Sequence, residues 1–385
     1  MTRQVCVVVT ARPSYARIKT LLESIRQRGD LKLQLVVAAS ALLERYGPVV
    51  DVIRSDGFEP DEIVYMVLEG ENLVTQAKST GLGVVELATI FDNLKPHIVV
   101  SVADRYETIA TAIAASYLNL PVAHVQGGEV TGSIDEKVRH AVTKLSNLHF
   151  VSNQHAADRV IKMGELPETV FITGCPSIDL AARVSGNNTW RIDARRLFNG
   201  GVGKPFDLTD PYLIVMQHPV TTEVDGGLAQ VTETLEAVVA LRMNTFWFWP
   251  NVDAGSDQIS KGIRVFRERN SPGNVYFLKN LPPENFLVLL NNAGCLAGNS
   301  SAGIRECSYL GVPVVNIGNR QAGRERASNV VDVAYDRNAI AIAVRAQVTH
   351  GRYPSSNLYG DGHAGSRIAE LLANVPFKIE KRIAY

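Results

Sequence analysis

The sequence predicts an α/β protein with two Rossmann-like, doubly wound domains and a cleft between them. Two observations predict this fold class. Short runs of β-branched residues alternate with amphipathic stretches, and the series starts again after a segment rich in Gly, Asn, Asp and Pro. The runs are apolar without strict polar alternation, which is typical of strands buried on both faces of a parallel sheet. The length of 385 residues also favours two domains.

The first domain is predicted over residues 1–185. Its expected strands are Val5–Thr10, Leu33–Ala38, Ile98–Val102, Val122–Val125, Leu148–Val151 and Val170–Thr173. Its clearest helical patterns are Ala16–Arg28, Val84–Leu94 and Thr108–Tyr117. Strands and helices that alternate in this way predict βαβ units around a parallel sheet.

A domain boundary is predicted in Ser185–Asp210, because SGNNTW, FNGGVGKP and DLTDP break the pattern. The second domain is predicted over residues 186–364. Its expected strands are Tyr212–Gln217, Thr245–Trp249, Val275–Leu278, Gly294–Ala297 and Val312–Ile317. A C-terminal helical region, 365–385, is expected to pack back on the first domain; its helical pattern is Gly365–Ala373, and a basic tail follows. Loops after the strands of two such domains would surround one cleft, which suits an elongated ligand.

The composition of the chain argues against several classes of binding partner. Lys and Arg number 39 and Asp and Glu number 39, so the chain is not built to bind a nucleic acid or an anionic membrane through net charge. The four cysteines, Cys6, Cys175, Cys295 and Cys307, form no CxxC pair, which argues against a zinc site and favours a reducing compartment. No stretch predicts a signal peptide or a membrane span, so we expect a cytoplasmic protein.

Two loops of the first domain carry charged residues directly after a predicted strand. In the first, Arg12 and Arg17 flank Ser14 where a helix begins, a position that favours an anion. The alternative is a pair of solvated arginines beside a Pro turn. In the second loop, Asp104 could transfer a proton and Arg105 could hold a phosphate or orient Asp104. The alternative is that Asp104 only caps the next helix.

A third loop combines glycines with several ionisable groups. Gln126-Gly-Gly-Glu129 is followed by Asp135, Glu136 and Arg139. Glycines allow a close backbone approach to a ligand, and clustered carboxylates are suited to proton transfer. The spacing from Ser133 to Glu136 also matches a capping box, which would explain Glu136 without a functional role.

The second domain offers polar residues for an anionic ligand. His218 and Asn251 each follow a predicted strand, and both positions are also compatible with a structural residue or a turn. The segment AGNSSAGIRE supplies a polar loop before a helix, which suits a pyrophosphate, and Glu306 could accept hydrogen bonds from ribose hydroxyls. The alternative is that Ser300 is a plain N-cap beside a surface cluster of arginines.

At these residues the chain resembles the hydrolysing branch of the UDP-N-acetylglucosamine 2-epimerase family. The resemblance rests on GNSSAGIRE, GVPVVNIGNRQAGRE, HPVTTE, PNVDAGS and GGEVTGSIDEKVRHAVTKLS, which lie in order along nearly the whole chain. It implies a glycosyltransferase-B-like fold. It also implies removal of the C2 proton of the sugar while UDP leaves C1, followed by addition of water to the resulting glycal, with no redox cofactor and no catalytic metal.

The resemblance also assigns residues. It implies that Asp104, Asp135 and His218 lie near the reacting carbons or the leaving phosphate, and the candidate catalytic residues also include Glu129 and Gln126. The resemblance implies that UDP is bound by Arg12, Arg105, Ser300, Ser301, Glu306 and Arg320. The candidate binding residues for UDP and sugar also include Ser14, Arg17, Arg139, Asn251 and Asn299. The chain departs from the family pattern at Gln126, where a Glu is usual, and at Ser14, where an Asp is common. An amide cannot act as a base, so Glu129 or Asp135 would take that role.

The expected substrate is UDP-N-acetylglucosamine or a 4-acetamido-6-deoxy relative, and the expected assembly is a homo-oligomer, either a dimer or a tetramer. Two other functions stay open from the sequence. One is a glycosyltransferase of the same fold that uses an acceptor other than water. The other is a binding protein for UDP-sugars that lost catalysis through Gln126.

Overall fold

The computed structural model of the chain describes residues 2–44, 49–70, 72–131, 134–187, 191–250, 253–270, 272–376 and 378–384. The chain forms two compact units. Unit 1 comprises residues 1–129, 134–180 and 359–385, and unit 2 comprises residues 130–133 and 181–358. The division at residue 180 falls inside a helix, whereas the sequence placed the boundary after residue 185. Unit 1 is therefore assembled from three separate segments of the chain.

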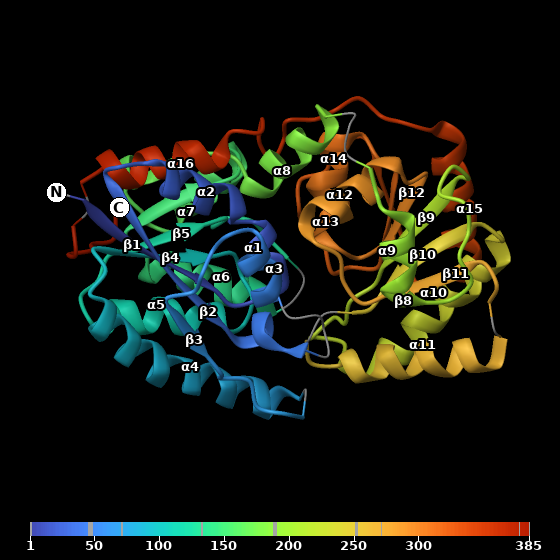
Figure 1. The fold of residues 1–385 in the computed structure, drawn as a ribbon, viewed down its shortest axis with the longest axis horizontal. Coiled ribbons are helices and arrows are strands. Elements are labelled where there is room, and N and C mark those ends of the chain that lie inside the picture. Colours follow the sequence, from blue (N-terminus) through green and yellow to red (C-terminus); the bar gives the residue numbers. More distant parts are fainter. Residues whose placement is uncertain are drawn as a thin grey trace. The chain divides into compact units, whose positions relative to one another are not determined.

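Unit 1 contains a seven-stranded parallel sheet in the order β3-β2-β1-β4-β5-β6-β7 (Figure 1). The strands are β1 (Arg3–Val9), β2 (Leu31–Ala38), β3 (Glu62–Val64), β4 (Ile98–Val102), β5 (Val122–Val125), β6 (Leu148–Val151) and β7 (Val170–Ile172). Predicted strands at β4, β5 and β6 are confirmed to the residue. β3 was not predicted, because three residues at the edge of a sheet leave little apolar pattern.

Helices lie on both faces of this sheet. They are α1 (Arg12–Ala16), α2 (Lys19–Gln27), α3 (Val49–Ser55), α4 (Leu73–Leu94), α5 (Thr108–Tyr117), α6 (Ile134–Leu145), α7 (Gln154–Lys162), α8 (Pro176–Ser185) and α16 (Ala364–Asn374), with short 3-10 turns at Ala39–Leu42 and Pro167–Thr169. Successive residues of β1 point to opposite faces: Val7 packs in the core with α2 and α16, and Val8 packs in the core with α4 and α5. A strand buried on both faces needs apolar residues throughout, as the sequence has.

Unit 2 contains a second seven-stranded sheet in the order β14-β13-β12-β9-β10-β11-β8. Its strands are β8 (Gly201–Val202), β9 (Tyr212–Met216), β10 (Asn244–Phe248), β11 (Val275–Leu278), β12 (Cys295–Gly298), β13 (Val314–Ile317) and β14 (Val330–Val333). Its helices are α9 (Ala194–Asn199), α10 (Gly227–Leu241), α11 (Ser256–Asn270), α12 (Pro283–Asn292), α13 (Ser301–Ile304), α14 (Glu306–Leu310) and α15 (Arg337–His350), with a 3-10 turn at Val224–Gly226. Both halves of the chain thus have the predicted doubly wound α/β architecture.

The segment in which the sequence predicted the boundary contributes to unit 2. It carries α9 and β8, and β8 pairs antiparallel with β11, so the second sheet is parallel except at this edge. Phe198 and Phe206 from the segment pack on Phe246 of β10, with ring centroids 5.9 and 4.7 Å apart. Turn-forming residues dominate this part of the sequence. For this reason the packing of its two aromatic side chains on one face of the sheet was not predicted.

The helical pattern over Gly365–Ala373 is confirmed by helix α16, and the rest of the predicted region 365–385 is not part of this helix. Helix α16 ends at Asn374, and it packs against α2 within unit 1. The contact is close, because a Cβ atom on Gly365 would lie 2.6 Å from the carbonyl carbon of Thr20.

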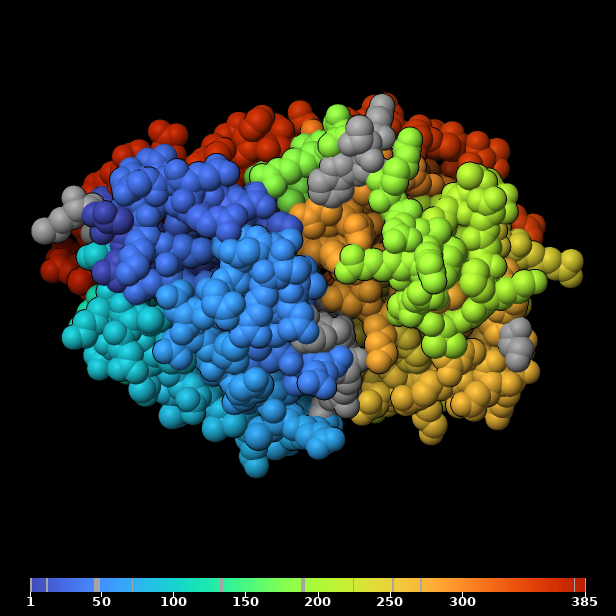
Figure 2. Space-filling model, viewed as in Figure 1, coloured from blue at the N-terminus to red at the C-terminus, as the bar shows by residue number. Residues whose placement is uncertain are grey.

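None of the described helices combines the length and the apolarity that crossing a membrane requires. Figure 2 shows the light-blue part of the chain, which includes α4, at the surface, and α4 exposes Leu73 and Val85.

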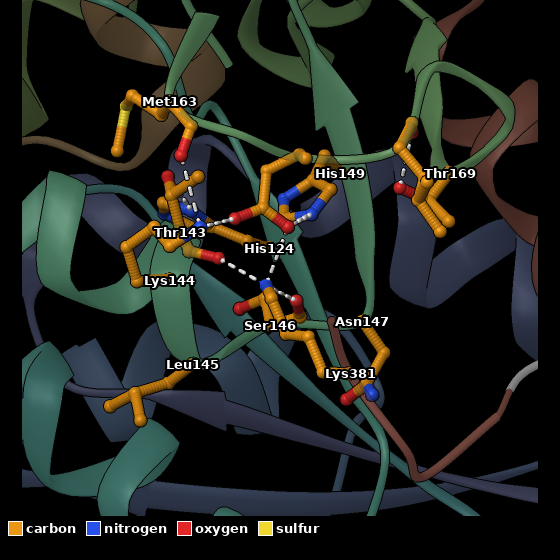
Figure 3. A network of polar contacts seen from close by, with 12 residues as sticks. His124, Thr143, Lys144, Leu145, Ser146, Asn147, His149, Met163, Thr169 and Lys381 are labelled. Carbon is orange, nitrogen blue, oxygen red and sulfur yellow. Dashed lines mark hydrogen bonds and ion pairs between the residues drawn. The ribbon is translucent and has the colours of Figure 1, made fainter. Parts of the chain in front are cut away.

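In the segment after α16, Lys381 contacts a buried carboxylate of unit 1, in addition to the backbone contacts of this segment (Figure 3). Lys381 Nζ lies 2.6 Å from Glu165 Oε2 and donates to the carbonyl oxygen of Thr143, at 3.1 Å. Lys144 Nζ and His149 Nε2 lie 2.6 and 3.0 Å from the same carboxylate. Burial alone raises the pKa of Glu165, but hydrogen bonds from these three bases outweigh burial and lower the pKa to about 2.

Candidate active site

The sheet of unit 1 has a topological switch point between β1 and β4, because connections leave these neighbouring strands toward opposite edges. Open α/β sheets bind ligands at the carboxyl ends of the strands beside such a point. The loop after β1 carries Ser14 and Arg17, and the loop after β4 carries Asp104 and Arg105. All four residues are buried. The side chain of Arg12 lies outside the described part of the structure.

Asp104 is held between two arginines. Arg17 Nη1 lies 3.4 Å from Asp104 Oδ1, and Arg139 Nη2 donates to Asp104 Oδ2. The cap of helix α5 is Glu107 and not Asp104, so the alternative in which Asp104 only caps a helix is wrong. The two guanidinium groups fix the carboxylate in one position and surround it with positive charge. Such a carboxylate is suited to proton exchange with a ligand at the switch point.

Arg139 joins three parts of this site. Its side chain is fully buried, and besides Asp104 it contacts the carbonyl oxygen of Glu129 at 2.8 Å and Glu136 Oε2 at 3.1 Å. Glu136 also accepts from His140 Nε2 at 2.9 Å. Arg139 was predicted to bind substrate, and its observed partners are protein groups. The capping box proposed for Glu136 involves Ser133, which lies outside the described residues.

The turn after β5 requires a special backbone. Gln126 has a φ of 69° and Gly128 a φ of 75°. A Cβ atom on Gly128 would lie 2.2 Å from the carbonyl oxygen of Ala156, so only glycine fits there. Positive φ at a residue other than glycine costs roughly 1–3 kcal/mol and is concentrated at functional sites.

Gln126 and Glu129 both turn into the protein at this loop. Gln126 Nε2 donates to Cys175 Sγ at 2.7 Å, and Gln126 Oε1 is buried without a partner among the described residues. Glu129 is fully buried, and its Oε1 accepts a hydrogen bond from Ser152 at 3.2 Å. Asp135 lies in the first turn of α6 and is half-buried. Of these three residues, Asp135 is therefore the one most open to a ligand.

The sheet of unit 2 has its own switch point between β9 and β12. Asn299 lies directly after β12, and its side chain contacts both backbone polar groups of His218, which lies two residues after β9. Asn299 Oδ1 accepts from the backbone N–H of His218 at 2.7 Å, and Asn299 Nδ2 donates to the carbonyl oxygen of His218 at 2.8 Å. The predicted binding residue Asn299 thus joins the two loops. Asn251, the other predicted amide, lies outside the described residues.

The residues after Asn299 form two short helices, whereas the sequence predicted one. Ser300 accepts from the backbone N–H of Ala302 and caps α13, as its capping alternative predicted. The helix breaks at Arg305, so Glu306 begins α14 and does not lie inside the predicted helix. Ser301 is the first residue of α13 and is half-buried. Arg320 Nη1 lies 3.3 Å from the carbonyl oxygen of Asn299, which places its positive charge beside this loop.

The sequence profile of the UDP-N-acetylglucosamine 2-epimerase family matches residues 23–373. The chain belongs to this family. A Legionella pneumophila member, UDP-N,N'-diacetylbacillosamine 2-epimerase (hydrolyzing), is 34% identical to the chain over 98% of this chain and 97% of its own length. A second 2-epimerase of the family, UDP-N-acetylglucosamine 2-epimerase of Neisseria meningitidis, is 27% identical over 97% of this chain and 96% of its own length.

Solved structures of 2-epimerases share the fold. A crystal structure of UDP-GlcNAc 2-epimerase from Neisseria meningitidis bound to UDP-GlcNAc has a TM-score of 0.78 at 16% identity, and it covers 96% of this chain and 99% of its own. The UDP-GlcNAc 2-epimerase of Methanocaldococcus jannaschii, in complex with UDP-GlcNAc and UDP, has a TM-score of 0.77 at 17% identity, with coverage of 96% and 99%. Our chain therefore has the glycosyltransferase-B-like fold of the 2-epimerase family.

Sequence reasoning missed three residues that support the candidate loops within each unit. Glu107 is fully buried and its Oε1 accepts from Arg105 Nε at 2.9 Å. Gln321 Nε2 donates to the carbonyl oxygen of Asn299 at 2.9 Å. His124 contacts the carbonyl oxygen of Ala103 at 2.9 Å. The only feature of the sequence that could have identified them is their position, because each lies within two residues of a predicted site residue along the chain.

Proposed function

We propose that the chain is a hydrolysing 2-epimerase that converts a UDP-linked 2-acetamido sugar and water into UDP and the free 2-epimeric sugar. The observation that carries this proposal is Asp104, a carboxylate held between two arginines at the switch point of unit 1. Membership of the 2-epimerase family and the hydrolysing Legionella relative support it.

The reaction needs two proton transfers and a leaving group. A base takes the proton from C2 of the sugar, the C1–O bond breaks, and UDP leaves with the bonding electron pair. Water then adds its oxygen to C1 of the glycal, and a proton returns to C2 from the opposite face. We assign these proton transfers to Asp104 and Asp135. Glu129 is a weaker candidate because it is fully buried and bound to Ser152.

Unit 2 is assigned to the nucleotide. The departing UDP carries negative charge, which Arg320 and the hydroxyl groups of Ser300 and Ser301 would stabilise. His218 would donate to a phosphate oxygen or transfer a proton to it. Glu306 would accept from the ribose hydroxyls, since one of its carboxylate oxygens is buried without a partner among the described residues.

The identity of the sugar is the finer part of the proposal. Gln126 stands where the family usually has Glu, and its side chain contacts Cys175. The Legionella relative acts on a diacetylated bacillosamine by its name, and it is more similar to this chain than the Neisseria relative is. We therefore favour the UDP-linked 2,4-diacetamido-6-deoxy sugar over UDP-N-acetylglucosamine.

The test is incubation of the purified protein with each UDP-sugar in deuterated water. We expect free UDP together with a free 2-epimeric sugar that carries deuterium at C2, at a higher kcat/KM for the diacetamido substrate. Deuterium-free products would exclude the glycal route. Binding of both UDP-sugars without release of UDP would identify a binding protein, and turnover only after addition of a sugar acceptor would identify a glycosyltransferase.

A further inference from the structure

Ala103 adopts a backbone conformation that its side chain disfavours. It links β4 to Asp104 and has a φ of 63°. For a residue with a Cβ atom this conformation costs roughly 1–2 kcal/mol, so the surroundings must hold it. Strand β5 does so from both sides: Ala103 donates its N–H to the carbonyl oxygen of Val125 at 2.9 Å, and its own carbonyl oxygen contacts His124 Nε2 at 2.9 Å.

The hydrogen bonds of His124 define its tautomer. A carbonyl oxygen can only accept, so the Nε2 atom of His124 carries the hydrogen in its contact with Ala103. The ring is fully buried, and burial is the main cause that lowers the pKa of His124 from 6.5 to about 3. The ring is therefore neutral, and its Nδ1 atom must accept from the hydroxyl group of Thr143, at 3.1 Å. Gly127 leaves room for this contact, because a Cβ atom there would lie 3.0 Å from Nδ1.

These hydrogen bonds connect helix α6 to the loop that carries Asp104. Thr143 lies one helical turn after Arg139, the residue whose guanidinium group donates to Asp104. One helix therefore reaches Asp104 twice, directly through Arg139 and indirectly through Thr143 and His124. Figure 3 shows His124 and Thr143 beside the polar network around Lys381.

We propose that His124 is a positioning residue for Asp104. Its neutral ring donates from Nε2 to the Ala103 peptide and keeps the Asp104 carboxylate between Arg17 and Arg139. Because the ring is fully buried and both nitrogens are bound, His124 acts through the backbone and does not touch the substrate. The kinetic consequence rests on the proposed function, since it assumes that Asp104 exchanges a proton with the sugar.

Two substitutions at His124 distinguish the hydrogen bonds made by its two ring nitrogens. In His124→Gln the side-chain amide nitrogen can occupy the place of Nε2 and keep the bond to Ala103. In His124→Asn the shorter amide reaches only the place of Nδ1 and loses that bond. We expect His124→Asn to lower kcat by roughly tenfold to a hundredfold, because misplacement of a reacting group has effects of this size. KM should change by less than about threefold, and His124→Gln should keep most of the wild-type kcat.

His149 provides the matched control. It lies opposite His124 in the register of β5 and β6, is equally buried, and contacts Glu165 instead of Ala103. His149→Asn and His149→Gln should have similar kcat values, both close to that of the wild-type protein. If the Asn variants at both positions lost activity equally, or if His124→Asn and His124→Gln were equally impaired in kcat, the positioning role would be overturned.

Two further measurements keep the proposal testable. Crystal structures of the two His124 variants need no turnover: Ala103 should keep its positive φ with Gln and lose it with Asn, and an unchanged Asp104 in the Asn variant would contradict the proposal even if the wild-type protein proved inactive. If His124→Asn does not fold, Thr143→Val removes the donor to Nδ1 at nearly constant volume. We expect it to lower kcat by about threefold or more, and an unchanged kcat would count against the proposal.

Discussion

At the scale of single residues, the position of a residue at the end of a predicted strand identified it as a candidate site residue. The side chains that it contacts could not be predicted. Asp104 and His218 were recognisable because each directly follows an apolar run that predicts a strand. The contact between Asp104 and Arg139 was not predictable, because it joins residues 35 positions apart, one in the loop after β4 and the other in helix α6, that meet only in the folded protein. The same holds for Gln126 and Cys175, which are separated by 49 positions.

The division of roles among the acidic residues and Gln126 can be tested directly. Asp104→Asn should lower kcat by roughly 10²–10⁴-fold, the range typical of general acid–base groups, with little change in affinity for UDP. Asp135→Asn should also be severely impaired. Gln126→Ala should lose less than about tenfold, because an amide transfers no proton and contributes only hydrogen bonds. Steady-state kinetics and calorimetric titration with UDP measure both quantities, and equal losses in all three variants would contradict our assignment.

At the scale of elements, long amphipathic or fully apolar segments were predicted well and short ones were not. Strands β4, β5, β6 and β11 match the predicted ranges. Strand β14 has a mixed pattern, with two of its four residues exposed, so periodicity could not identify it. The order of strands in each sheet is a tertiary property, and it required the structure.

The end of β12 shows how an element depends on one residue. Gly298 has a φ of 132°, and a Cβ atom there would lie 2.1 Å from the carbonyl oxygen of Met216 in β9. Gly298→Ala should therefore lower the free energy of unfolding of unit 2 by roughly 2–4 kcal/mol. Gly294→Ala is the control, because the nearest atom to its Cβ would be 3.5 Å away. Urea unfolding measures the difference, and similar values for the two variants would refute this explanation.

At the scale of the whole molecule, the two doubly wound units follow from the repeated pattern in the sequence, and the return of the C-terminal region to the first domain was also expected, but the side-chain contacts that hold this region there were not. The segment 359–385 returns to unit 1, where Lys381 contacts a carboxylate on a distant part of the chain. Sequence alone identifies the basic character of the tail after residue 373. It could not identify Glu165 as the partner, because nothing in the pattern around Glu165 marks it as buried.

We expect Lys381→Met to lower the free energy of unfolding by roughly 2 kcal/mol at pH 7, because it removes a donor from a buried carboxylate. Lys378→Met is the control, since that side chain is exposed. The folded-state pKa of Glu165 is lowered from 4.5 to about 2, so its stabilising effect is fully present above pH 4.5 and is lost as the pH falls toward 2. The destabilisation should therefore be smaller at pH 3.5 than at pH 7, and a constant difference in urea unfolding would argue against this origin.

The assembly of unit 1 from distant segments has a consequence during synthesis on the ribosome. Residues 181–358 of unit 2 are complete before helix α16 is translated, whereas unit 1 lacks its packing partner for α2 until the final residues emerge. Domains generally fold as units while the chain grows. Translation of unit 1 thus begins before that of unit 2 and is completed after it. A nascent chain stalled before residue 359 would present an uncovered apolar surface on α2 to chaperones.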